Sequence, residues 1–187
     1  EQYEAGLADL RRAHELNPND ALTLSLLGQY EAGAGDPLTG MRQAADALRL
    51  SPRDALRWSF LNSLAWACFA ARDYTQAAES AQRSIGEAPR FHPPHLCLVV
   101  SRIGLGETAA ARAAFKRLHD LAPQTVVARL AGHWNYADPG LVKRATTDGV
   151  PLWEILPQAR SVTDLSQPAV DGAHGLVSLV RGFQKKF

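Results

Sequence analysis

The chain has 187 residues and a net charge of +1. With 46% hydrophobic residues, it is long enough to form one domain with a continuous core. Its charges are mixed in sign, without a run of five or six like charges, so we expect no nucleic-acid-binding and no membrane-binding surface. The sequence contains neither an apolar run of about 18 residues nor a signal-peptide pattern. A cytoplasmic location is therefore the default expectation.

Four prolines divide the first two thirds of the chain at nearly even intervals. The intervals are 34, 37 and 34 residues, and each proline follows a segment with helical periodicity: Pro18, Pro52, Pro89 and Pro123. A period of this length is typical of stacked helix pairs. Small residues stand where the two helices of a pair approach closely. Twelve positions before the prolines these are Gly6, Gly40, Ala77 and Ala111. Five positions before them stand Ala13, Ala47, Ser84 and the one large exception, Leu118.

Each full repeat also carries a turn sixteen or seventeen residues before its proline. The turns are Gly35-Asp36, Arg72-Asp73 and Gly106-Glu107. Asp36 followed by Pro37 predicts a helix N-cap with proline in the first turn. The glycines around Gly106 resemble a dinucleotide-binding loop in letters only, because that loop follows a strand and here a helix precedes it.

Two stretches of the chain, 3–20 and 27–54, resemble tetratricopeptide (TPR) repeats. The residues that carry the resemblance include Ala13-His14-Glu15-Leu16-Asn17-Pro18 and Leu50-Ser51-Pro52-Arg53-Asp54, and the likeness covers about residues 3–124. It implies an all-α TPR helical-hairpin solenoid, a right-handed superhelix with a non-repeat C-terminal capping tail. It divides the TPR-like region, 1–149, into a half repeat 1–20, repeats 21–54, 55–91 and 92–124, and a degenerate closing pair 125–149, followed by the tail 150–187.

The third repeat is three residues longer than its neighbours, and the additional residues lie between Asp54 and Arg72. Three residues are nearly one turn of an α-helix. An apolar stripe of Trp58, Leu61 and Leu64 continues through this part. We therefore expect the first helix of this repeat to be lengthened.

The chain starts at the second helix of its first repeat, so we expect it to be a fragment of a longer polypeptide. The residues Trp134-Asn135-Tyr136-Ala137-Asp138-Pro139 and Gly149-Val150-Pro151 resemble the close of TPR regions in bacterial adenylate-cyclase-like and winged-helix regulatory proteins. That resemblance implies a larger bacterial signalling or regulatory protein, whose cyclase or DNA-binding domain would precede Glu1.

The sequence shows no catalytic grouping, so we expect no enzyme, no cofactor and no metal. His92 and His95 bracket two prolines at the entry to a helix, and no Cys or carboxylate joins them nearby. Cys68 and Cys97 fall on the first helices of adjacent repeats, and we expect both to be buried free thiols.

In the TPR family the first helix of each pair lines a concave groove. Carrying the family positions over to this chain gives seven groove residues: Gln29, Asn62, Trp66, Phe69, Leu96, Val100 and Ile103. This groove is mostly apolar and lacks the Lys/Arg/Asn set with which TPR chaperone adaptors bind a C-terminal carboxylate. It favours a helix or an apolar peptide. If the longer third repeat shifts the register, Trp66 and Phe69 belong to the core instead, and the sequence leaves both interpretations open.

The tail carries a predicted amphipathic helix near 170–185. Its apolar stripe consists of Leu176, Val177, Leu179, Val180 and Phe183. A helix this short needs a surface to lie on. Stacking on the last repeat as a cap is favoured over occupation of the groove, because a solenoid ordinarily continues by stacking its next helix.

Two functions follow from these expectations. The first is a non-catalytic protein–protein interaction or scaffold module that binds a protein or peptide partner and is compatible with a homo-oligomer. The second is a ligand-sensing domain that binds a small apolar molecule or short peptide, with autoinhibition by the tail as a further option.

Overall fold

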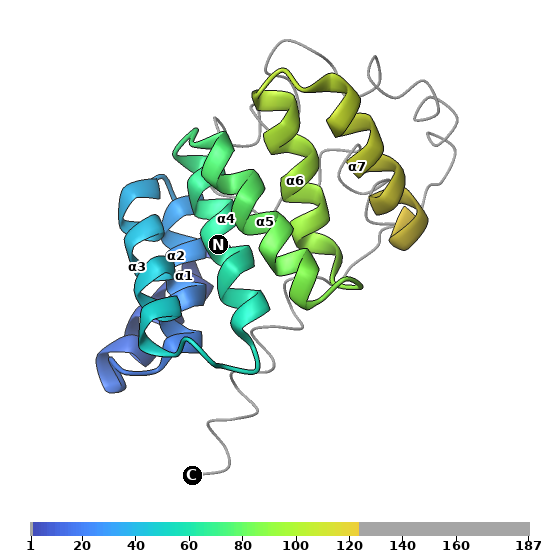
Figure 1. Ribbon diagram of the computed structural model, residues 1–187. Helices are drawn as coiled ribbons and strands as arrows, with labels where there is room; N and C mark the ends of the chain where they lie inside the picture. Colours follow the sequence, from blue (N-terminus) through green and yellow to red (C-terminus); the bar gives the residue numbers. More distant parts are fainter. Residues whose placement is uncertain (1, 124–187) are drawn as a thin grey trace.

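A computed structural model describes residues 2–123 of the chain. These residues form seven α-helices and no strand (Figure 1). The helices are α1 (Gln2–Leu16), α2 (Ala21–Gly33), α3 (Pro37–Leu50), α4 (Arg57–Ala70), α5 (Tyr74–Glu87), α6 (His92–Gly104) and α7 (Thr108–Leu121).

Successive helices are joined by short turns and lie beside one another, so that they form the pairs α2/α3, α4/α5 and α6/α7 (Figure 1). Helix α1 packs on α2. The predicted all-α, TPR-type stack of helical hairpins is thereby confirmed for the described residues. The predicted closing pair 125–149 and the tail 150–187 lie outside them.

Aspartates at the helix starts explain where several helices begin. Asp20 accepts a hydrogen bond from the backbone N–H of Leu22 at 3.1 Å, and Asp36 accepts one from that of Thr39 at 3.1 Å. Asp73 caps α5 in the same way. These bonds satisfy N–H groups that have no partner inside the helix. The backbone N–H of Thr39 also lowers the pKa of the Asp36 carboxyl, because it stabilises the charged form.

The turn inside each hairpin requires a left-handed residue. Gly35 and Gly106 have φ values of 108° and 74°, and Arg72 occupies the same repeat position with φ of 65°. Glycine adopts this conformation without steric cost, whereas a residue with a side chain is strained there. The middle hairpin is therefore the one whose turn has an unfavourable residue.

Replacing Arg72 with glycine is expected to raise the free energy of unfolding by about 0.5–1 kcal/mol, because the steric cost of the left-handed conformation disappears. The greater conformational entropy of glycine in the unfolded chain offsets part of this gain. The measurement is the urea midpoint. Gly35→Ala is the matched control, because a methyl group there would meet no atom within 4 Å. It should be destabilising, and an Arg72→Gly variant less stable than the parent would contradict this explanation.

The expected lengthening of the first helix in the third repeat amounts to a single residue. Helix α4 has 14 residues, against 13 in both α2 and α6. The additional residues lie mainly in the connection before α4, where the side chain of Asp54 accepts hydrogen bonds from the backbone N–H of Leu56 at 2.8 Å and from Ser51 Oγ at 3.0 Å. A carboxylate that bonds the backbone two residues ahead stabilises a turn.

The helices of the α2/α3 pair cross at two glycines. A methyl group added at Gly40 would lie 2.4 Å from the carbonyl oxygen of Gly28, and one added at Gly28 would lie 2.7 Å from that of Gly40. Between hairpins, Phe60 of α4 is fully buried against a cluster that includes Ala47 of α3 and Leu24 of α2. The predicted small residues thus stand where helices approach most closely.

Candidate functional site

The seven predicted groove residues lie on the three first helices: Gln29 on α2, Asn62, Trp66 and Phe69 on α4, and Leu96, Val100 and Ile103 on α6. We call these seven residues the first-helix face. Gln29 and Ile103 are partly buried, and the other five are buried. The structure gathers the apolar members into one core cluster, which contains the buried residues Trp66, Phe69, Leu96 and Val100, and Ile103 packs against this cluster.

Helix α4 is buried along twelve consecutive residues, Ser59–Ala70. Three of its sides are occupied by neighbouring helices. Phe60 packs in the cluster with Ala47 of α3, and Cys68 Sγ donates to Oε1 of Gln76 on α5 at 3.0 Å. Ser63 Oγ donates to Oε1 of Gln29 on α2 at 3.2 Å.

The remaining side of α4 carries Ser59, Asn62 and Trp66. Residues three and four apart share one side of a helix, because each residue turns the chain by about 100°. This side is directed away from the α3 side that holds Phe60 and from the α5 side that holds Cys68. It is the side that the repeat pattern assigns to the groove.

The aromatic residues on this face also reach into the hairpin. The rings of Trp66 and Phe69 meet edge to face, with centroids 5.8 Å apart, and the ring of Phe69 lies 5.6 Å from that of Tyr74 at the start of α5. Phe69 therefore supports the α4/α5 pair as well as the first-helix face. A substitution at Phe69 would change the fold and the face together.

Two buried oxygens on the first helices have no hydrogen-bond partner. They are Oγ of Ser25 on α2 and Oδ1 of Asn62 on α4. The two residues occupy equivalent positions, one repeat apart. A buried polar atom without a partner costs about 1–3 kcal/mol, so a group that donates a hydrogen bond here would be favoured.

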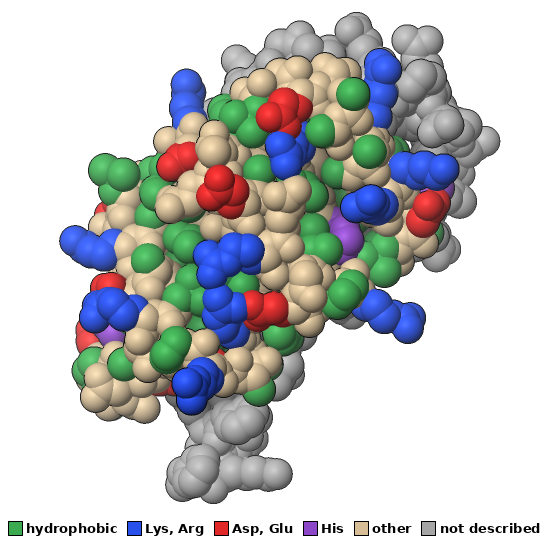
Figure 2. Space-filling view, viewed as in Figure 1, with side chains coloured by type: hydrophobic (Ala, Val, Ile, Leu, Met, Phe, Trp, Pro, Cys, Tyr) green, Lys and Arg blue, Asp and Glu red, His purple; other side chains and the backbone are tan. Residues whose placement is uncertain are grey.

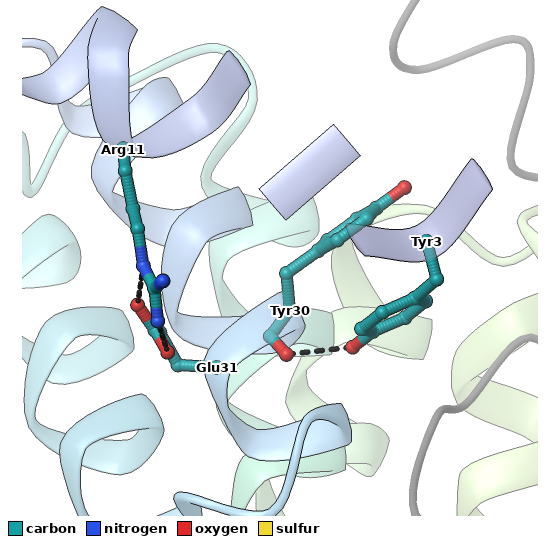
Figure 3. A network of polar contacts seen from close by, with 4 residues as sticks. All are labelled: Tyr3, Arg11, Tyr30 and Glu31. Carbon is teal, nitrogen blue, oxygen red and sulfur yellow. Dashed lines mark hydrogen bonds and ion pairs between the residues drawn. The ribbon is translucent and has the colours of Figure 1, made fainter. Parts of the chain in front are cut away.

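A network between α1 and α2 was missed by the sequence analysis (Figure 3). Arg11 donates two hydrogen bonds to the Glu31 carboxylate, both at 2.8 Å, and Tyr3 Oη donates to the backbone oxygen of Tyr30 at 2.6 Å. The two tyrosine rings stack with centroids 4.8 Å apart. Glu31, the one charged residue in α2, was the available signal. The network fixes α1 on α2, and burial raises the pKa of Tyr3.

The predicted free thiols are confirmed, since Cys68 and Cys97 are both buried and unpaired. Burial raises the pKa of Cys68 to about 12 and raises that of Cys97 as well, because it disfavours the charged thiolate. A thiol attacks as its thiolate. Burial thus disfavours the reactive thiolate at both positions, as expected for small core residues.

Within residues 2–123, no three His, Cys, Asp or Glu side chains come together in a way that could hold a metal ion. His95 instead bonds the backbone oxygen of Pro89 through Nε2 at 2.9 Å. The described helices are also each too short or too polar to cross a membrane. In Figure 2, basic and acidic side chains are interspersed on the visible surface of these helices.

Comparisons with known proteins support the fold. No protein-family model and no curated protein matches the chain. Among solved structures, the chain is similar to MamA, with a TM-score of 0.58 and 18% sequence identity, over 86% of this chain and 88% of that one. At this identity the likeness shows the fold alone. The chain is thus a TPR-type helical solenoid over its described residues.

Proposed function

We propose that the chain is a non-catalytic interaction module that binds a helix or peptide of a protein partner on its first-helix face. The observation that carries this proposal is the alignment of apolar side chains at one repeat position after another, on α4 and α6, in a single cluster. Helical repeats stack into extended surfaces, and large apolar side chains supply most of the energy at protein interfaces.

The proposal extends to the setting of the module. We propose a cytoplasmic bacterial signalling or regulatory protein as the larger polypeptide. Its support is the resemblance of the residues from Trp134 to Pro151, which lie outside the described part of the chain.

A ligand-sensing function is the second candidate, and the unpartnered oxygens of Ser25 and Asn62 favour it. A small molecule or short peptide with hydrogen-bond donors would satisfy both atoms while its apolar parts contact Trp66. Such a ligand would co-purify with the chain, and native mass spectrometry would detect it as added mass.

The test of the leading proposal is a pull-down from a lysate of the source cells, with the full chain as bait and mass spectrometry as the readout. Ile103 is the residue to change, because it is only partly buried and packs against the cluster from outside its fully buried members. Ile103→Lys is expected to reduce capture of the partner at least about tenfold, since loss of one interface anchor costs more than about 1 kcal/mol.

Ile85→Lys is the matched control. Ile85 is also a partly buried isoleucine, but it lies on the second helix α5, outside the first-helix face. Both variants should keep the parent's helical circular dichroism. Equal capture by the parent and both variants would move the binding surface away from the first helices and overturn the proposal.

A further inference from the structure

We draw no further inference here: the strongest candidate, the pair of buried oxygens of Ser25 and Asn62 that lack a hydrogen-bond partner on the adjacent helices α2 and α4, belongs to the site already described.

Discussion

Replacing Gly40 with alanine is expected to lower the free energy of unfolding by roughly 1–3 kcal/mol, even though alanine is the better helix former. The added methyl group would lie 2.4 Å from the carbonyl oxygen of Gly28 and 2.7 Å from Cβ of Ala32. Backbone atoms cannot rotate away, so α2 and α3 must separate. Urea unfolding followed by circular dichroism gives the change in free energy.

The control for Gly40→Ala is the same substitution at Gly86. This glycine also lies in a helix, α5, but a methyl group there would meet no atom within 4 Å. Gly86→Ala should therefore be neutral or stabilise by up to about 1 kcal/mol. If both substitutions changed stability equally, the close crossing of α2 and α3 would not be what requires glycine at position 40.

Replacing Phe60 with alanine is expected to lower the free energy of unfolding by about 3–5 kcal/mol, the largest effect of any single change proposed for this chain. Phe60 is 0% exposed and fills the junction between the α2/α3 hairpin and α4. Its removal leaves a cavity between hairpins rather than within one. The measurement is again the free energy of unfolding from urea denaturation.

Leu38→Ala is the comparison for Phe60→Ala. Leu38 is a large apolar residue that is 75% exposed at the start of α3, so its loss should change stability by less than about 0.5 kcal/mol. A small effect at Phe60 would mean that the hairpins are held together elsewhere, which would contradict the continuous core that joins the repeats.

The sequence predicted the fold well because the repeat encodes it several times. Gly35, Arg72 and Gly106 were assigned to turns from their spacing alone, and all three have the positive φ that such turns need. Asp36 and Pro37 likewise begin α3 as expected. Because the same turn recurs at each repeat, every occurrence supports the assignment of the others. A single motif offers no such check.

The length of α4 was not predictable from periodicity. Trp58, Leu61 and Leu64 keep a helical spacing whether the additional residues extend the helix or the connection before it. The side chain of Asp54 accepts a hydrogen bond from the backbone N–H of Leu56 and stabilises a turn just before α4. Apolar spacing carries no information about such a turn.

Family position proposes which residues form the first-helix face, but it gives neither their contacts with other helices nor their burial. Spacing along one helix shows which residues share a side, and Asn62 and Trp66 do so because they lie four residues apart on α4. It does not show the contacts between helices far apart in sequence, such as Ser63 with Gln29 or Arg11 with Glu31. It also does not give burial, so the near-complete burial of Trp66 emerged only from the structure.

Hydrogen–deuterium exchange of the full chain, with and without a protein captured in an Ile103-dependent manner, tests the central claim most directly. Binding to the first-helix face predicts slower exchange in peptides from α2, α4 and α6, with residues 57–70 and 92–104 most affected. Slower exchange confined to the second helices α3, α5 and α7 would contradict the claim, because the partner would then lie on the opposite side of the stack.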